Sequence, residues 1–178
     1  GSGEISGDTI SIRKFKSDNL LKGSNESPDW SRFIFKNRGR LYFIYTMITI
    51  LATGKVRERY IKEGMEEYLT RLQKYAKVMY VEKESLNVPD GYVIALDERG
   101  KHYTSEQFAD YIKKKTLEQK NITFIIGGAE GIPTEIKVRC NESIALSAMT
   151  FPNQLVRLIF VEQFYRAFTI IKGEPYSH

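Results

Sequence analysis

Strand-like and helix-like segments alternate along most of this chain, and that alternation restricts its possible folds more than any other feature. Short runs rich in β-branched and aromatic residues occupy residues 41–53, 78–81, 92–96, 122–126 and 143–146. Helical spacing of apolar residues is found in residues 56–75, 105–117 and 153–169, and a short helix should run from Pro133 to about Arg139. We therefore predict an α/β domain with a mostly parallel sheet, flanked by helices and joined by right-handed crossovers.

Two of these helices carry further signals. Thr104 and Gln107 form a capping-box pattern at the start of the helix at 105–117. Lys113, Lys114 and Lys115 lie in its last turns, where they suit the negative end of the helix dipole, an interpretation that we prefer to a phosphate site. Apolar side chains spread widely around the helix at 153–169, which favours burial within the domain and against a second subunit.

Residues 1–46 differ from the rest. They hold eight basic and five acidic residues, which gives +3 of the chain's net charge of +5. Arg32, Lys36, Arg38 and Arg40 alternate with aromatic residues, as in an arm that contacts RNA, but an upstream or vector-derived segment is the simpler interpretation. We predict an N-terminal extension of uncertain origin at 1–46 and one domain at 47–178, with Met47 as a plausible natural start.

Composition disfavours several kinds of chemistry. The single cysteine, Cys140, excludes an internal disulfide and a multi-cysteine zinc site, and His102 and His178 belong to no cluster with metal-ligand spacing. No G-x-S-x-G nucleophile motif is present. No apolar run reaches the roughly 18 residues that span a bilayer, and no secretory signal is recognisable. We expect a cytoplasmic protein with no metal and no membrane partner.

A glycine turn follows the apolar run at 122–126. The sequence GGAEG, residues 127–131, lacks the spacing of a dinucleotide fingerprint and the Gly-Lys-Ser/Thr of a phosphate loop. Glu130 within the turn would repel a phosphate. Because ligands bind beyond the carboxyl ends of parallel strands, this turn is either structural or one wall of a pocket for a ligand without a pyrophosphate.

A second loop, residues 146–152, follows the last predicted strand. Met149 and Phe151 offer apolar surface there, and the backbone offers hydrogen-bond donors and acceptors. Such a lining would suit a flat heteroaromatic ring with polar edges, although on this evidence alone a well-packed connection between strand and helix is the better explanation.

Three segments and the chain's last residues together resemble the RlmH family. They are MITILATGKVRERYIKEGMEEYLTRL (47–72), FIIGGAEG (124–131) and SAMTFPNQLVRLIFVEQFYRAF (147–168), followed by the terminal GEPYSH. These proteins are SPOUT-class, S-adenosylmethionine-dependent methyltransferases that modify N3 of a pseudouridine in large-subunit ribosomal RNA. The resemblance covers residues 47–178.

The resemblance implies a SPOUT (alpha/beta knot) fold, in which the C-terminal segment passes through a loop as a deep trefoil knot. It implies a homodimer that binds S-adenosylmethionine in the knot and acts on ribosomal RNA of the large subunit or of the assembled ribosome. Carried over by motif, the cofactor contacts would be Leu96 at the end of its strand, Gly127 in the glycine turn, and Leu146, Ser147, Ala148, Met149, Thr150 and Phe151 in the second loop.

The same resemblance suggests residues on the RNA side. Tyr176 matches a family position near the target base, and Arg157 and Arg166 match family arginines on the long helix, where they are candidates for RNA contacts. Glu130 and His178 are our candidates for accepting the proton that the base must lose.

The chain departs from the family pattern at several positions. Asn153 stands where the family usually has histidine, the chain ends Tyr-Ser-His instead of Tyr-His-Lys or Tyr-His-Arg, and the segment between Val81 and Tyr92 is shorter than usual. Two other functions therefore stay open. One is a ribosome-binding or assembly protein that keeps the fold without activity, and the other is a SPOUT methyltransferase that acts on transfer RNA.

Overall fold

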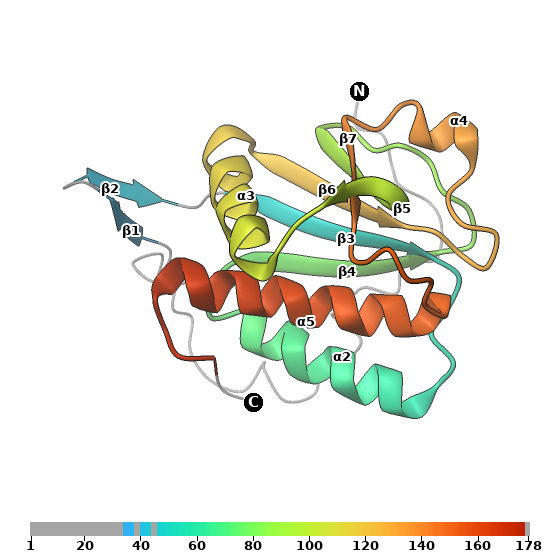
Figure 1. Ribbon diagram of the computed structural model, residues 1–178, viewed down its shortest axis with the longest axis horizontal. Coiled ribbons are helices and arrows are strands. Elements are labelled where there is room, and N and C mark those ends of the chain that lie inside the picture. Colours follow the sequence, from blue (N-terminus) through green and yellow to red (C-terminus); the bar gives the residue numbers. More distant parts are fainter. Residues whose placement is uncertain (1–33, 38–39, 44–45, 177–178) are drawn as a thin grey trace, which may run out of the picture.

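The computed structural model describes residues 34–37, 40–43 and 46–176. Two short strands come first, β1 (Ile34–Asn37) and β2 (Arg40–Phe43), which pair antiparallel as a hairpin. A separate sheet of five parallel strands forms the body of the protein, with strand order β4-β3-β6-β5-β7. Figure 1 shows these strands with the helices packed around them.

The elements follow the predicted alternation. Strands are β3 (Met47–Thr53), β4 (Lys77–Lys83), β5 (Tyr92–His102), β6 (Asn121–Ile126) and β7 (Glu142–Ala145). Helices are α2 (Arg59–Leu72), α3 (Ser105–Glu118), α4 (Thr134–Lys137) and α5 (Asn153–Lys172). The capping box at Thr104 and Gln107 is confirmed, because each side chain bonds the backbone N–H of the other residue.

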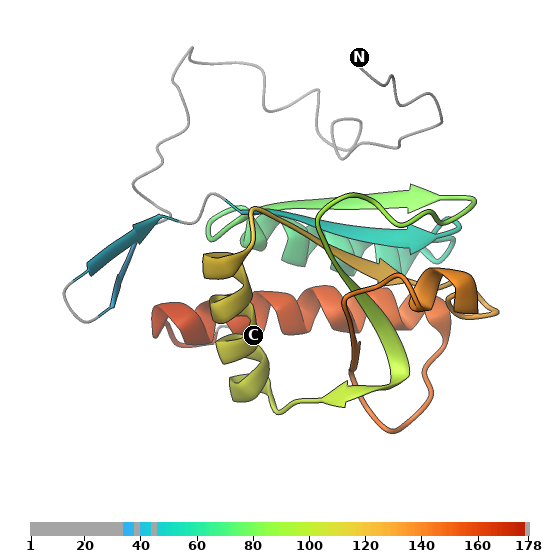
Figure 2. The ribbon, with the colours of Figure 1, turned by 90° about the horizontal axis from the view of Figure 1, so that it is seen from above.

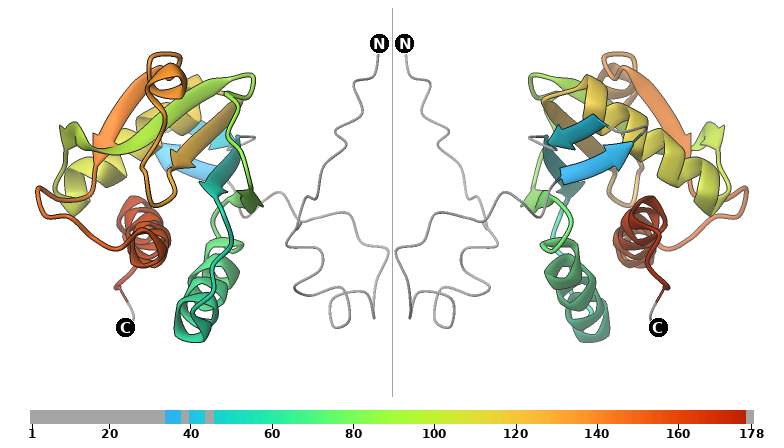
Figure 3. Two further views of the ribbon diagram at one scale, coloured as in Figure 1. Left: turned by 90° about the vertical axis from the view of Figure 1, so that its right-hand side faces the viewer. Right: turned by 90° about the vertical axis from the view of Figure 1, so that its left-hand side faces the viewer.

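The helices divide unequally between the two faces of the sheet. Helices α2, α3 and α5 cover one face, while α4 lies on the other, as the side views in Figure 3 show. From above, α3 crosses the amino-terminal side of the sheet beside α5 (Figure 2). A hydrophobic core lies on each face of the sheet, the larger one under α2, α3 and α5 and the smaller one under α4. Alternating strand residues point into the two cores: Ile94 faces the larger core, whereas Val93 and Ala95 face the smaller one.

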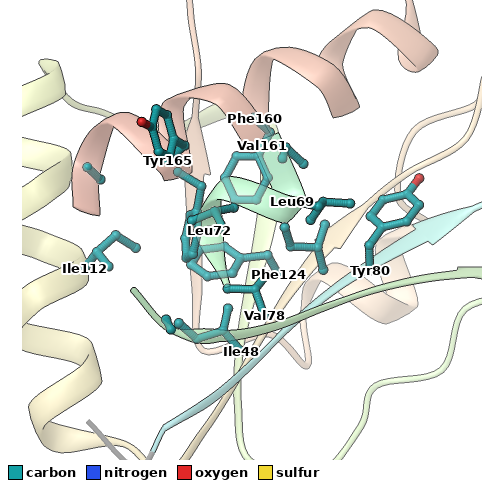
Figure 4. Packing of buried hydrophobic residues seen from close by; sticks show 14 of the residues in the cluster. Ile48, Leu69, Leu72, Val78, Tyr80, Ile112, Phe124, Phe160, Val161 and Tyr165 are labelled. Carbon is teal, nitrogen blue, oxygen red and sulfur yellow. The ribbon is translucent and has the colours of Figure 1, made fainter. Parts of the chain in front are cut away.

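Aromatic rings from α5 fill the larger core. Phe160 and Phe164 both lie against Phe124 of β6, at ring-centroid distances of 5.1 and 5.3 Å. Figure 4 shows Phe124 and Phe160 at the centre of the cluster, with Leu72 of α2 and Ile112 of α3 around them. Burying an aromatic or aliphatic side chain of this size contributes about 1.5–3 kcal/mol each, so this layer is the main stabilising element.

A polar cluster closes the amino-terminal edge of the sheet. Lys115, near the end of α3, is only 9% exposed and donates to Glu142 at 2.5 Å and to the hydroxyl of Tyr92 at 2.7 Å. The hydroxyls of Tyr92 and Tyr111 also donate to Glu142. Because Tyr92 begins β5 and Glu142 begins β7, this cluster joins α3 to the first residues of two neighbouring strands.

Two predicted boundaries were wrong. The apolar run at 41–53 is divided between β2, which belongs to the hairpin, and β3, which begins at Met47. The strand predicted to end at Leu96 instead continues to His102, with a bulge between Leu96 and Lys101 that bends it along β7. The basic and aromatic segment at 30–40 lies mostly outside the described residues.

Candidate active site

Three segments predicted to hold a cofactor meet at one edge of the sheet. Leu96 of β5 pairs in register with Ile126 of β6 on one side and with Ile144 of β7 on the other. Gly127 follows Ile126 directly, and the loop at 146–151 begins two residues after Ile144. The carboxyl ends of β6 and β7 and the start of the β5 bulge between them therefore present these segments together, on the right-hand side of Figure 1.

The glycine turn is closed by its own backbone. Gly131 has φ of +75° and donates its N–H to the carbonyl oxygen of Gly128 at 3.0 Å. A Cβ on Gly127 would lie 2.3 Å from the carbonyl carbon of Gly131, so only glycine fits there. A Cβ on Gly128 would lie 3.5 Å from Thr53, which is ordinary contact. The requirement for glycine at 127 thus comes from the turn itself.

An ion pair fixes this turn against the bulge of β5. Lys137 of α4 donates to the carboxylate of Asp97, which also accepts the backbone N–H of Arg99 at 3.0 Å. Burial raises the pKa of Asp97, but the bonds from Lys137 and Arg99 outweigh it and hold that pKa below its ordinary value. The pair connects the residue after Leu96 with the helix that follows the glycine turn.

The loop at 147–151 leaves most of its polar groups available to a ligand. Among the described residues, its backbone makes no turn or loop bond to another backbone group, and only Met149 N–H is engaged, by the hydroxyl of Ser147 at 3.0 Å. Met149 is 73% exposed, and Leu146 and Phe151 are half-buried. Backbone donors and acceptors beside apolar side chains are the lining expected for a flat heteroaromatic ring with polar edges.

The candidate proton acceptors differ in position. Glu130 is exposed in the glycine turn, at the same edge as the three segments. His178 lies outside the described residues. Tyr176, the candidate for contacting the target base, follows the end of α5. Its hydroxyl donates to Glu162 at 2.5 Å, and its ring lies against Tyr165. Glu162 is nine residues after Asn153, which corresponds to roughly 14 Å of helix.

The two candidate arginines have contrasting surroundings. Arg166 is partly exposed, with 32% of its side chain accessible, and its guanidinium lies 3.8 Å from the centroid of the Tyr176 ring while bonding Glu162. Arg157 is 1% exposed and donates to the carbonyl oxygens of Thr53 and Gly54 at 2.5 and 2.8 Å. A guanidinium held in this way does not suit the RNA contact predicted for Arg157, so we assign it a structural part.

Sequence reasoning also missed Gln154. Its side-chain oxygen accepts the backbone N–H groups of Arg57 and Glu58 at 2.8 and 3.2 Å, and so joins the first turn of α5 to the residues before α2. Helical spacing could have revealed Arg157, since it precedes Phe160, Val161 and Phe164 by three, four and seven residues on the buried face. No comparable signal marks Gln154.

Several other features bear on the kind of site. A hollow of about 40 Å³ between Gly54 and Glu84 is far below the roughly 300–1,000 Å³ of a typical ligand pocket, so it is not the cofactor site. No three His, Cys, Asp or Glu side chains in the described part of the chain are placed to hold a metal ion. None of the helices described has both the length and the apolar character that a membrane span requires.

Comparison with known proteins decides the family. A family model described as "Predicted SPOUT methyltransferase" matches residues 81–178. The protein named Ribosomal RNA large subunit methyltransferase H from Carboxydothermus hydrogenoformans is 43% identical over 155 residues, which cover 72% of this chain and 98% of that protein. The protein of the same name from Bacillus pumilus is 41% identical over the same shares. The chain belongs to the SPOUT methyltransferase family.

A solved structure supports the fold of this SPOUT methyltransferase independently. A probable methyltransferase from Bordetella pertussis Tohama I covers 70% of this chain and 96% of its own, with a TM-score of 0.50 and 9% sequence identity. At that identity the likeness shows the fold alone. Together with the family match, this likeness confirms the α/β fold that the resemblance implied, a parallel sheet flanked by helices, and the knot stays a prediction from the family.

Proposed function

We propose that this SPOUT methyltransferase transfers a methyl group from S-adenosylmethionine to N3 of a pseudouridine in large-subunit ribosomal RNA. The observation that carries the proposal is the match to proteins named for methylation of that RNA, at about 40% identity over 98% of their length. Such a substrate would place the activity in the cytoplasm. We assign the activity to residues 47–178, because the parallel sheet begins with β3 at Met47.

The cofactor would lie at the edge where β6 and β7 end and where β5, between them, begins its bulge. Leu96, Gly127 and Leu146 to Phe151 would contact it, with the backbone of 147–151 bonding its polar edges and the apolar side chains covering its flat surface. S-adenosylmethionine, when bound, supplies a methyl group that its positively charged sulfonium already activates. Glu130, a carboxylate in the neighbouring turn, would favour a cationic ligand over a phosphate.

The chain's own residues would contribute positioning and proton transfer. Holding the base nitrogen in line with the methyl group can lower the barrier by roughly 7–11 kcal/mol at best. Burial raises the pKa of Tyr176, and its bond to Glu162 raises it further, so this hydroxyl stays protonated at neutral pH. Tyr176 therefore suits positioning of the base, while Glu130 and His178 remain the candidates for accepting the N3 proton.

We also propose that the active unit is a homodimer. Tyr176 and Arg166 lie together, but the helix between Asn153 and Glu162 separates them from the cofactor edge of their own chain by roughly 14 Å. A second copy would bring its Tyr176 and Arg166 to the cofactor of the first, and Arg166 would then reach an RNA phosphate. This arrangement places each complete site across the interface.

The test is methyl transfer with a labelled cofactor. Purified protein is incubated with labelled S-adenosylmethionine and, separately, with ribosomes from cells that lack the modification, free large-subunit RNA and transfer RNA. Mass mapping of nuclease fragments should place one methyl group on a pseudouridine of large-subunit RNA. Methylation of transfer RNA alone would identify the other enzyme class. Calorimetric binding of the cofactor without transfer to any substrate would favour an inactive assembly protein.

A further inference from the structure

The segment between β3 and α2, residues 54–58, is held rigidly although it contains no regular structure. Gly54 donates its N–H to the carbonyl oxygen of Lys83 at 2.8 Å and accepts from buried Arg157 at 2.8 Å. The N–H of Val56 donates to Glu82 at 3.0 Å, and the Val56 side chain is 4% exposed. These contacts fix the first half of the segment to the carboxyl end of β4.

Helix α5 fixes the second half. The side-chain oxygen of Gln154 accepts from the N–H groups of both Arg57 and Glu58. The backbone is thus anchored on two sides, and the side chains of residues 55, 57 and 58 are exposed. A rigid backbone that projects exposed side chains is preorganised for binding, because less conformational entropy is lost when a partner arrives.

These exposed side chains are mostly basic. Residues 54–62 contain Lys55, Arg57, Arg59 and Lys62 against one carboxylate, Glu58, which gives a formal charge of +3. Within the described residues, no carboxylate lies in ion-pair distance of Lys55 or Arg57. Arg59 pairs with Glu63, but at side-chain exposures of 90% and 59% such a pair is worth little and is readily exchanged for a phosphate.

An exposed aromatic ring adjoins this charge. Tyr60, in the first turn of α2, is 63% exposed, which leaves most of a large aromatic side chain in contact with solvent. An exposed aromatic ring beside basic side chains is the combination with which proteins bind unpaired RNA, because the ring stacks on a base while the cations contact phosphates.

The segment borders the cofactor edge. A Cβ on Gly128 would lie 3.5 Å from the side chain of Thr53, so the end of β3 touches the glycine turn. Gln154, which anchors Arg57, lies three residues after Phe151 of the predicted cofactor loop. An RNA that contacts residues 55–60 would therefore run past the site where the methyl group is transferred.

We propose that Lys55, Arg57 and Arg59 form a docking surface for the phosphates of the substrate RNA, and that Tyr60 stacks on an unpaired base beside the methylated one. This inference rests on the proposed function, which supplies the RNA. It gives α2 and the segment before it a part in substrate recognition that neither the cofactor contacts nor the tail provides.

The charge is tested with the full chain and a matched control. The double variant Lys55→Gln, Arg57→Gln removes two charges from the surface, and Lys113→Gln, Lys114→Gln removes two from α3 near the opposite edge of the sheet. Affinity for a deproteinised hairpin of large-subunit RNA is measured at several salt concentrations. The first variant should bind at least about tenfold more weakly than wild type. The slope of log affinity against log salt concentration should fall by the equivalent of about two phosphate contacts, whereas the control should match wild type in both affinity and slope.

Stacking is tested separately at one position. Tyr60→Ala should weaken RNA binding by about tenfold without changing the salt slope, and Tyr60→Phe should retain wild-type affinity, because the ring and not the hydroxyl stacks. Calorimetry with S-adenosylmethionine should give the same affinity for all these variants, since none of the residues contacts the cofactor.

The outcomes separate the two proposals. If wild type methylates ribosomes and the Lys55, Arg57 variant binds and methylates as the control does, the docking surface is wrong and the function stands. If wild type transfers no methyl group to RNA while the variant loses RNA affinity and salt slope as described, the function is wrong and the surface stands. Equal loss in the control variant would show a general charge effect and overturn the surface.

Discussion

The guanidinium of Arg157 bonds the carbonyl oxygen of Gly54 across 103 residues of sequence. The same group donates to Thr53 and to the hydroxyl of Tyr80, with Glu82 at 3.6 Å. One buried side chain of α5 thus donates to the carbonyl groups at the end of β3. The same side chain also contacts two residues of β4. Without it, those carbonyl oxygens would be buried and lack a donor, a costly arrangement in a protein interior.

Arg157→Met should therefore destabilise the protein by about 2–4 kcal/mol, because it leaves two carbonyl groups and the Glu82 carboxylate without their partner. Urea denaturation followed by circular dichroism measures this loss. Arg166→Met, which changes a partly exposed arginine on the same helix, is the control and should cost less. A stable Arg157→Met protein that had lost only its RNA affinity would restore the RNA contact predicted from the sequence.

Two neighbouring glycines should respond differently to the same change. Gly127→Ala places a Cβ 2.3 Å from the backbone of Gly131, so the turn must open, at a cost of about 1–3 kcal/mol. Gly128→Ala meets only ordinary contact with Thr53 and should leave the melting temperature nearly unchanged. Thermal denaturation compares the two variants, and calorimetry with S-adenosylmethionine should show weakened binding for Gly127→Ala. Equal melting temperatures would contradict the described turn geometry.

The Lys115 cluster should make stability depend on acid pH. Burial raises the pKa of Glu142, but its bonds from Lys115, Tyr92 and Tyr111 outweigh burial and hold the pKa below its ordinary value. A carboxylate whose pKa is lower in the folded than in the unfolded protein stabilises the fold. This stabilisation is complete above the pKa of the unfolded state, about 4.3, and is lost as the pH falls through the pKa of the folded state.

Denaturation of wild type and Glu142→Gln between pH 7 and pH 3 tests this dependence. The difference in unfolding free energy between wild type and Glu142→Gln should be largest near neutral pH. It should shrink below about pH 4.3, because the wild-type carboxylate becomes protonated and neutral there. Glu118→Gln, the control, removes an exposed carboxylate from the end of α3. Its unfolding free energy should differ little from that of wild type at every pH. A constant difference for Glu142→Gln would argue against the bonded carboxylate.

Mixing experiments should reveal whether a site is shared between two chains. Tyr176→Ala and Phe151→Ala should each lower methyl transfer strongly on their own. If one chain supplies the loop and the other the tail, mixed dimers regain one intact site, and a refolded equal mixture should recover about one quarter of wild-type activity. No recovery in a mixture shown to contain mixed dimers would place both residues in the site of a single chain.

The alternation of elements could be predicted because local pattern determines it, and the buried strands and the Thr104 cap followed directly from spacing. The bulge after Leu96 could not, since Asp97 to Gly100 is a polar sequence that resembles a turn. The strand resumes beyond it because β7, which pairs with Leu96, also pairs with Lys101 and His102. Lys115 was interpreted as part of a basic helix end, and Arg157 as a candidate for an RNA contact. The partners of Lys115 lie 23 and 27 residues away and those of Arg157 lie more than 70 residues away, so only the folded chain brings them together.

For the candidate site too, some features could be predicted from the sequence and others could not. The two loops could be predicted from the rule that ligands bind beyond strand ends, and Leu96 came from the resemblance to a family. Strand order was not predicted, yet it alone makes these three segments neighbours, with β5 between β6 and β7. Gln154 could not be foreseen, because a glutamine that accepts from the backbone of the residues before another helix leaves no pattern in its own sequence.

Strand β5 has no earlier neighbour in the sheet. Among the described strands it pairs with β6 and β7 alone, both of which follow it along the chain, and β3 acquires its second neighbour only when β6 has been made. A nascent chain that has emerged as far as residue 102 can pair β3 with β4 but must leave β5 without a partner. Completion of the sheet is therefore delayed until β7, at residues 142–145, has been synthesised, and its long-range pairings predict slow folding.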